Sequence, residues 1–287
     1  MTKVMFDVAI IGAGPTGAAL ALLVAKAGLS VALVDARDPS ISPQPDGRNF
    51  AIVTGSWRLL DSIDITENLI ESSQPLLVLE AVDGCRHLFG QPSILFSDSD
   101  LDAPDPDETL GHMVMAAPLQ AALDEAVKDH ASIDVFAPER FAGLSHHADR
   151  VEIALDSGKI LSAALIVGAD GMYSPVRQAL GIGVEGRDYN KSVLTANVHL
   201  SAPHEGIARQ LFTPEGPFAT LPLTGQRANL AWYMKRGAAE ALAARPVPEV
   251  EAELNARFSD FAGDMRIDGK VGSYPLVLQI ADKITGP

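Results

Sequence analysis

The chain has 287 residues, of which 47% are hydrophobic and 21% charged, so it has room for one large or two ordinary soluble globular domains. Its 37 acidic residues outnumber its 22 basic ones and give a formal net charge of −15, which disfavours nucleic acid as a partner and offers no broad basic face to anionic lipid. The single cysteine, Cys85, excludes a disulfide framework and a cysteine-rich metal site and fits a cytoplasmic location.

The first predicted unit is a strand, a glycine turn, a helix and a second strand. Phe6–Ile11 is a short apolar run, as expected of a strand buried on both faces, and Gly28 marks the end of the helix that follows it. Leu29–Val34 is the second strand, and Asp35 stands at its carboxyl end, where an acid accepts hydrogen bonds from the ribose of a dinucleotide. The turn carries three glycines in G-x-G-x-x-G spacing, Gly12, Gly14 and Gly17.

Two plainer interpretations of this unit compete with a dinucleotide site. A glycine-rich turn in an ordinary α/β domain would show the same triplet, but the flanking strand and helix and the distance to Asp35 favour a dinucleotide. Val8–Ala25 carries no charge over 18 residues and is similar to a signal peptide or a membrane span. The clustered glycines, Pro15 and the preceding Asp7 argue against both of these.

The next segment is predicted to be a proline-containing loop and then a helix over Asn49–Ser62. Arg48 would stand at the start of that helix, where by spacing alone a surface ion pair explains it best. Leu76–Phe96 has two apolar patches separated by Asp83-Gly84, which predicts a hairpin in an antiparallel sheet. The acidic residues 98–108 predict a solvated loop.

Helix and strand patterns alternate again up to residue 165. His146 and His147 are adjacent and have no partner at ligand spacing, so no metal site is expected there. The predicted elements are the helix Pro118–Asp129, the strands Ile133–Phe136 and Phe141–Leu144, and a hairpin of Val151–Leu155 with Ile160–Leu165.

A second motif follows the apolar strand Leu165–Val167. Asp170-Gly171 comes directly after the end of this strand, where open α/β sheets bind ligands. Ser174 is placed to cap a helix that begins at Pro175 and carries Arg177. By itself the segment is equally well explained as a simple strand-to-helix turn.

The rest of the chain is predicted to be mainly β-structure, with one helix over Glu249–Phe261. The sequence therefore predicts an α/β fold in which a dinucleotide-binding domain of separated segments receives an inserted, mostly antiparallel sheet domain. The predicted strands are Val193–Leu200, Gly206–Phe212, Phe218–Leu223, Asn229–Tyr233 and Val271–Leu278, the last of them interrupted by Pro275.

Taken in order, these motifs resemble the para-hydroxybenzoate hydroxylase-like flavin monooxygenases, and within them the ubiquinone-biosynthesis hydroxylases. The residues that carry the resemblance are Gly12-Ala13-Gly14-Pro15-Thr16-Gly17, Asp46-Gly47-Arg48 with Gly55-Ser56, Asp170-Gly171-x-x-Ser174-x-x-Arg177, Thr195-Ala196-Asn197-Val198, Phe212-Thr213-Pro214-Glu215-Gly216-Pro217 and Tyr274-Pro275-Leu276.

This resemblance implies a Rossmann-like FAD-binding domain over residues 1–75 and 106–185 and a substrate domain over residues 76–105 and 186–280. It implies that Gly12, Gly14, Pro15, Thr16 and Gly17 approach the FAD pyrophosphate. The other implied contacts are Asp35 with the adenosine ribose, Arg48 over the cofactor near the active site, Asp170 and Gly171 with FAD, and Arg177 in support of that loop.

The reaction implied by the resemblance is hydroxylation of a polyprenyl phenol in ubiquinone biosynthesis. NADH or NADPH would reduce FAD, O2 would add to give a flavin hydroperoxide, and its terminal oxygen would attack the ring. A substrate this apolar implies peripheral or complex-mediated attachment at the inner membrane. Homo-oligomerisation, the ring position and the prenyl length stay open.

Two departures from the family pattern stand out. Met115-Ala116-Ala117 replaces residues that are often Asn or Arg in this branch. The family's third fingerprint, a Gly-Asp before a helix that contributes to FAD binding and the dimer, is absent up to Pro287. The expectation is therefore an amino-terminal portion that binds FAD weakly and turns over poorly, if at all.

Three other functions remain as alternatives. A non-catalytic scaffold of the same pathway would explain the missing fingerprint, and bound flavin would separate it from an enzyme. An FAD-dependent reductase of the same fold would not need O2, so oxygen uptake coupled to NADPH oxidation would separate it. A halogenase would carry a Trp-containing motif and a lysine near the flavin, which have no convincing counterpart in this sequence. A plain NAD-binding domain leaves the segment from Asp170 to Arg177 unexplained.

Overall fold

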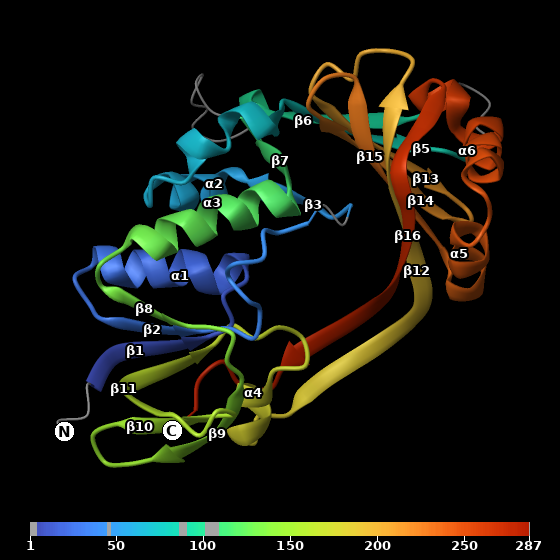
Figure 1. Cartoon of the computed structure of the whole chain (residues 1–287). Coiled ribbons are helices and arrows are strands. Elements are labelled where there is room, and N and C mark those ends of the chain that lie inside the picture. The colour runs from blue at the N-terminus through green and yellow to red at the C-terminus, as the bar shows by residue number, and fades with distance from the viewer. Residues whose placement is uncertain (1–4, 45–46, 86–90, 101–108, 287) are drawn as a thin grey trace.

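The computed structural model describes residues 5–44, 47–85, 91–100 and 109–286, which form two sheet-based halves and a small sheet between them (Figure 1). Asp46 of the predicted arginine segment, most of the predicted acidic loop and residues 86–90 lie outside the described residues. The predicted fold class is confirmed: a Rossmann-like half with parallel strands is joined to a mainly antiparallel sheet.

The first half is a six-stranded sheet in the order β8-β2-β1-β11-β10-β9. The strands β8, β2, β1 and β11 run parallel, and β10 and β9 are added antiparallel. The predicted strands Ile160–Leu165 and Leu165–Val167 are one strand, β11. The bounds are β1 (Met5–Ile11), β2 (Val31–Val34), β8 (Ile133–Phe136), β9 (Phe141–His146), β10 (Val151–Leu155) and β11 (Ile160–Gly168).

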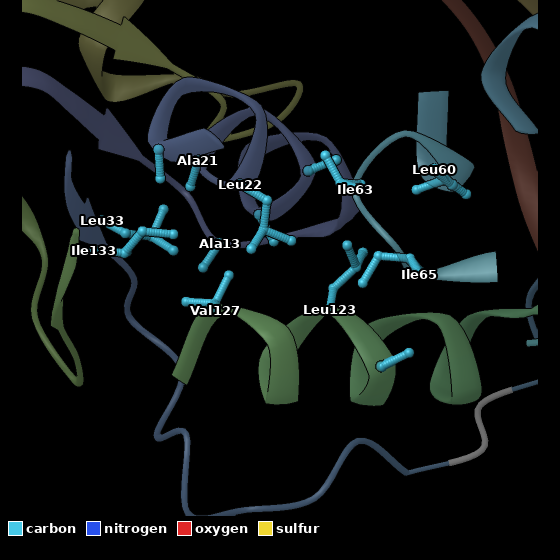
Figure 2. Close-up of a cluster of buried hydrophobic side chains, with 14 of the residues drawn as sticks. Ala13, Ala21, Leu22, Leu33, Leu60, Ile63, Ile65, Leu123, Val127 and Ile133 are labelled. Atoms are coloured by element: carbon cyan, nitrogen blue, oxygen red, sulfur yellow. The ribbon is translucent and has the colours of Figure 1, made fainter. Parts of the chain in front are cut away.

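Two helices, α1 (Pro15–Lys26) and α3 (Ala116–Asp129), cover one face of this sheet. Figure 2 shows Leu22 from α1 meeting Leu123 and Val127 from α3 over the strand residues Leu33 and Ile133. On the other face, side chains of β1 and β2 form a second buried cluster with side chains of β10 and with Val176 of the short helix α4 (Pro175–Ala179). β1 is therefore buried on both faces, as its continuous apolar sequence predicts.

The small sheet has the order β3-β7-β4 and corrects one prediction. The predicted helix Asn49–Ser62 is wrong in its first part: Asn49–Val53 is the strand β3, and α2 covers only Thr54–Asp61. The backbone of β3 pairs with β7 (Gly111–Met115). Local helical preference cannot predict this pairing, because β7 is distant in the sequence. The strand β4 (Ser73–Leu76) follows two short 3-10 turns, Thr66–Asn68 and Ile70–Ser72.

Trp57 of α2 stacks on His112 of β7, with ring centroids 3.8 Å apart and an interplanar angle of 12°. Burial lowers the pKa of His112 below its usual 6.5. Because the unfolded chain then binds more protons than the folded one, this residue removes stability as the pH falls below about 6.5.

We expect the pH dependence of urea unfolding between pH 7.5 and 5.5 to be shallower in His112→Phe than in the original chain (the range brackets about 6.5, the usual His pKa). The phenyl ring keeps the stacking surface and removes the titrating group. The measurement is tryptophan fluorescence during unfolding, with His146→Phe, whose side chain is exposed, as the control. An unchanged slope in His112→Phe would contradict the assignment.

The second half is a seven-stranded sheet in the order β16-β12-β15-β14-β13-β5-β6, in which only β13 and β5 are parallel neighbours among the described strands. The helices α5 (Arg236–Ala243) and α6 (Val247–Ala262) cover one face. The bounds are β5 (Val78–Asp83), β6 (Ser93–Ser97), β12 (Val184–Leu200), β13 (Ile207–Thr213), β14 (Gly216–Leu223), β15 (Arg227–Lys235) and β16 (Met265–Ala281).

Two predictions for this half need correction, and one helix was missed. β5 and β6 pair antiparallel, but Asp83-Gly84 is not a two-residue turn, because residues 84–92 separate the strands. The helix α5 was not predicted. Pro275 does not end the last strand, because β16 is an edge strand, where proline is tolerated, although the pairing with β12 shifts register next to Pro275.

The antiparallel strands β12 and β16 extend between the region beside α4 and the second sheet, and so connect the two halves (Figure 1). The predicted domain boundary between residues 185 and 186 falls inside β12, so one continuous strand crosses it. Within the described residues, no helix is both long enough and apolar enough to cross a membrane.

Candidate functional site

The two predicted motifs lie side by side at the carboxyl ends of β1 and β11. The strands are in parallel register up to Ile11 and Gly168, and the backbone N–H of Ala169 donates to the carbonyl oxygen of Ile11 at 2.7 Å. A Cβ placed on Gly12 would lie 2.4 Å from the carbonyl oxygen of Ala169. The two turns are therefore in backbone contact, although they are far apart in the sequence.

The three glycines of the first turn have different roles. Gly12 has φ +104°, and a Cβ on Gly17 would lie 1.8 Å from the carbonyl oxygen of Gly12. The turn itself therefore requires glycine at these two positions. Gly14 has φ −65°, and a Cβ there would meet nothing within 4 Å. The outer side of Gly14 is open for the approach of a ligand.

The amino end of α1 starts at this open position. Gly14 is the N-cap, no side chain makes a capping hydrogen bond, and Pro15 occupies the first turn. Thr16, also in the first turn, is exposed. The first backbone N–H groups of a helix have no partner within the helix, and the helix dipole favours an anion near them. This end of α1 is suited to a phosphate group.

Asp35 is held against the glycine turn. Its Oδ2 accepts a hydrogen bond from the backbone N–H of Ala13 at 2.6 Å, and its Oδ1 accepts one from the N–H of Arg37 at 2.7 Å. An ionised carboxylate has about four acceptor positions, so lone pairs remain for hydroxyl donors. Asp35 thus stabilises the turn, a role that the sequence did not indicate, and keeps capacity to bind a ribose.

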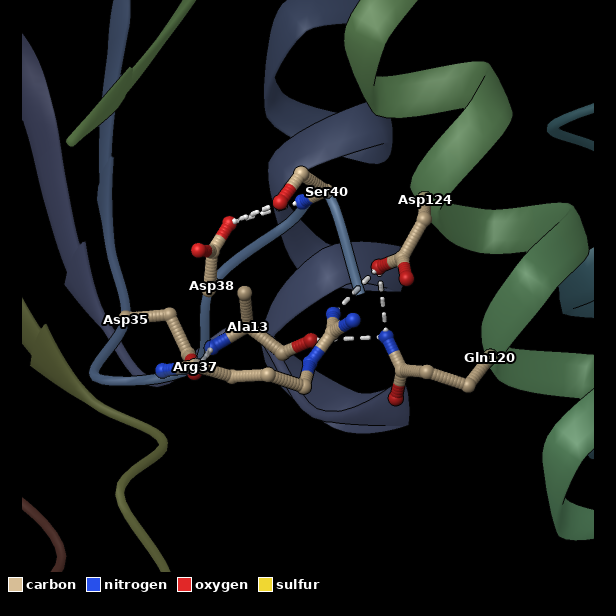
Figure 3. Close-up of polar contacts among 7 residues, drawn as sticks. All are labelled: Ala13, Asp35, Arg37, Asp38, Ser40, Gln120 and Asp124. Atoms are coloured by element: carbon tan, nitrogen blue, oxygen red, sulfur yellow. Dashed lines mark hydrogen bonds and ion pairs between the residues drawn. The ribbon is translucent and has the colours of Figure 1, made fainter. Parts of the chain in front are cut away.

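A polar network extends from this point to α3 (Figure 3). Arg37 Nη2 donates to Asp124 Oδ1 at 2.6 Å, and Gln120 Nε2 donates both to Asp124 Oδ1 at 2.8 Å and to the carbonyl oxygen of Ala13 at 2.9 Å. The hydrogen bond that Arg37 donates to Asp124 raises the pKa of Arg37 above its usual value. Sequence reasoning missed these side chains, although Gln120 and Asp124 stand four residues apart on one helix.

We expect the Arg37–Asp124 ion pair to contribute about 1 kcal/mol of coupling free energy, since both side chains are partly exposed. A double-mutant cycle of Arg37→Met and Asp124→Ala, measured by urea unfolding, gives this value. The same cycle on the exposed pair Arg150 and Asp149 is the control and should give a smaller coupling. If the two cycles gave equal coupling free energies, the Arg37–Asp124 pair would be no stronger than a surface ion pair. That result would contradict a role of the network in holding the turn.

An open pocket of about 740 Å³ lies beside this network. Asp35, Arg37 and Asp124 form polar parts of its wall, and Leu33 and Val135 contribute apolar surface from β2 and β8. A pocket at the carboxyl ends of adjacent parallel strands is where open α/β sheets bind their ligands. Its mixed lining suits a base and a ribose next to the phosphate position of α1.

The second turn is also organised as the motif predicts. Asp170 Oδ2 accepts from the backbone N–H of Val176 at 3.1 Å, and Gly171 has φ +85°. Ser174 caps α4 by accepting from the N–H of Arg177 at 3.0 Å, and Arg177 Nη1 donates to the carbonyl oxygen of Met172 at 2.9 Å. Asp170 Oδ1 is buried and has no hydrogen-bond partner among the described residues.

Arg48 stands at the start of the small sheet. It precedes β3, and its carbonyl oxygen accepts from the N–H of Ala116 at 3.0 Å, which joins this segment to the start of α3. Its neighbour Asn49 reaches the second half and contacts Asn197. The structure therefore puts Arg48 between the glycine-turn half and the seven-stranded sheet. In the part of the chain that is described, no three His, Cys, Asp or Glu side chains gather as metal ligands.

These observations fit the phosphate and ribose groups of a dinucleotide. The open side of Gly14 and the uncapped end of α1 suit a pyrophosphate, and Asp35 suits a ribose. The buried Oδ1 of Asp170 is an acceptor suited to a cofactor hydroxyl. The fold and the site together define a dinucleotide-binding protein with an added sheet domain.

The chain belongs to the FAD binding domain family, whose profile matches residues 5–277. It is 35% identical over 279 residues to "Ubiquinone hydroxylase UbiL" of Rhodospirillum rubrum, covering 96% of this chain and 63% of that protein. It is 30% identical to the "3-demethoxyubiquinol 3-hydroxylase" of Escherichia coli, covering 100% of this chain and 72% of that protein. The predicted resemblance to ubiquinone-biosynthesis FAD monooxygenases is confirmed.

Solved structures agree on the fold. PqsL, a probable FAD-dependent monooxygenase from Pseudomonas aeruginosa, has a TM-score of 0.73 at 21% identity, covering 95% of this chain and 74% of that chain. The flavin-dependent monooxygenase PieE, in complex with FAD and substrate, has a TM-score of 0.71 at 18% identity, covering 100% of this chain and 52% of that chain. At these identities the likeness shows the fold alone. The chain spans 63% of the length of the Rhodospirillum rubrum relative.

Proposed function

We propose that this chain binds FAD and serves the hydroxylation of the aromatic ring of a polyprenyl phenol in ubiquinone biosynthesis. The observation that carries the proposal is the backbone contact between the glycine turn and the turn of Asp170 at the ends of β1 and β11. That contact places the phosphate position at the amino end of α1 and the buried Oδ1 of Asp170 close enough together to bind the same ligand. The names of the two hydroxylase relatives support the pathway.

FAD, when bound, would supply the redox chemistry that ring hydroxylation with NADH or NADPH and O2 requires. The chain's own residues bind and orient. Backbone N–H groups beside Gly14 hold the pyrophosphate, Asp35 accepts from the ribose, and Asp170 Oδ1 accepts from a further hydroxyl. Arg177 keeps the second turn in place through Met172.

The seven-stranded sheet supplies the substrate surface. Its face opposite α5 and α6 is directed toward the glycine-turn half (Figure 1). On that face the strand register brings Leu221 of β14 next to Asn229 of β15, and Ala231 and Tyr233 follow along the same strand. Leu221, Ala231 and Tyr233 give this face an apolar part that binds a hydrophobic phenol and excludes water from the reaction.

The test uses the purified 287-residue chain. We expect saturable but weak FAD binding in an absorbance titration, and slow oxygen uptake that requires both a phenol and NADH or NADPH. Mass spectrometry should show one added oxygen in the phenol. Reduction of substrate without oxygen uptake would identify a reductase instead, and the absence of FAD binding at any concentration would overturn the proposal.

A further inference from the structure

Three asparagines form a hydrogen-bonded chain between the two halves of the molecule. Asn197 Oδ1 accepts from Asn49 Nδ2 at 2.9 Å and from Asn229 Nδ2 at 3.0 Å. Asn49 directly follows Arg48 at the start of β3, whereas Asn197 and Asn229 are paired residues of β12 and β15. The side chain of Asn197 is therefore held from both sides.

The partners determine which way each amide group points. Asn49 Nδ2 also donates to the carbonyl oxygen of Gly47 at 3.0 Å, and Asn229 Nδ2 donates to the carbonyl oxygen of Ala196 at 3.3 Å. A backbone carbonyl can only accept, so the contacting atom of Asn49 and that of Asn229 are both nitrogen. The atom of Asn197 between these two nitrogens must then be oxygen.

The nitrogen of Asn197 consequently points away from both partners. In the described part of the chain, Asn197 Nδ2 makes no hydrogen bond. Turning this amide over would place its N–H groups against two donors and lose two hydrogen bonds, at a cost of about 1 kcal/mol or more for each. Asn197 thus presents a donor whose direction is fixed before any ligand arrives.

This donor is on the face of the sheet that is directed toward the glycine-turn half. Leu194, Ala196 and Val198 are buried in the cluster formed with α5 and α6. Because side chains alternate along a strand, Asn197 is on the opposite face, which Figure 1 shows turned toward the other half. The neighbours of Asn197 on this face are polar: Asp268 of β16 is paired with it and forms ion pairs with His199 and Arg227. Within this polar region the fixed N–H of Asn197 is a donor for a ligand oxygen.

We propose that Asn197 Nδ2 donates a hydrogen bond to an oxygen on the aromatic ring of the substrate, so that Asn197 selects oxygenated rings and sets their orientation. The identity of the ring as substrate rests on the proposed function. The link to Asn49 ties the direction of this donor to the segment that carries Arg48. A displacement of that segment would therefore change how the ring is held.

The probes are 2-propylanisole and 1-ethyl-2-propylbenzene, which share their shape and differ in one ether oxygen. Calorimetry measures their Kd with and without FAD. We expect the original chain to prefer the anisole, and Asn197→Asp to weaken anisole binding about tenfold with little change for the hydrocarbon. The aspartate keeps an oxygen for Asn49 and Asn229 and replaces the donor with an acceptor. It also adds a negative charge opposite Asp268, and the affinity for the hydrocarbon controls for that change.

Val193→Thr is the matched control, because Val193 stands four residues away on the same strand and face and its apolar side chain takes no part in the hydrogen-bonded chain of asparagines. It should keep the preference for the anisole. As a measurement that needs no variant, the side-chain N–H signals of Asn197 in a ¹⁵N spectrum should shift with the anisole and not with the hydrocarbon. Equal affinity of the original chain for both probes, or an unchanged preference in Asn197→Asp, would overturn the proposal. An Asn197-dependent preference without FAD binding would support it while overturning the proposed function.

Discussion

Gly17→Ala is expected to destabilise the folded chain by about 3 kcal/mol or more. The added methyl group would lie 1.8 Å from the carbonyl oxygen of Gly12, and backbone atoms cannot give way as a flexible side chain can. Relief would require α1 to move away from β1, which would open the cluster that contains Leu22 and Leu123. Urea unfolding followed by circular dichroism measures the loss.

Gly14→Ala is the matched control for this stability effect. The change is the same and lies only three residues away, but its methyl group would meet nothing within 4 Å. The cost should be about 1 kcal/mol or less, because alanine is a poorer N-cap than glycine. If both variants lost the same stability, the distinction between the glycines of the turn would be wrong.

The same Gly14→Ala variant is expected to lose FAD, which makes it the second large effect. In the folded chain its methyl group would occupy the side of the turn from which a pyrophosphate approaches. Loss of a charge-assisted hydrogen bond costs about 1.5–3 kcal/mol, so Kd for FAD should rise roughly 100-fold. Absorbance or fluorescence titration of FAD gives the value.

Gly28→Ala separates this effect from a general influence of alanine on α1. Gly28 has φ +85° and stands after the other end of the helix, so its replacement should lower stability and leave the FAD affinity of the folded fraction unchanged. Unaltered FAD affinity in Gly14→Ala would mean that the cofactor does not approach the amino end of α1, and the proposed site would have to be abandoned.

The parts of the site that are organised by neighbouring residues could be predicted from the sequence. The capping of α4 by Ser174 involves a residue three positions away, and the stop of α1 depends on the conformation of Gly28. The motif at Asp170 likewise adopts the predicted strand, turn and helix. These features depend on local backbone preferences, which are determined by residues only a few positions apart in the sequence.

The predictions failed where a backbone finds its hydrogen-bond partners far away in the chain. Asn49–Val53 was assigned to a helix, but β7 provides a strand partner for it. The nearest neighbour of β5 on one side is the parallel strand β13, which follows it by more than a hundred residues (Ile207 pairs with Val78). Neither pairing has a signal within the segment itself.

The sequence by itself determined the class of ligand, since the glycine spacing, the acid at Asp35 and the second turn at Asp170 each have a local chemical meaning. Only the tertiary structure decided which glycine is free for a cofactor, how Arg37, Gln120 and Asp124 secure the turn, and where the amide of Asn197 points. The reason is physical: these properties depend on the distance and direction between groups on separate elements, and those are set by strand register and helix packing.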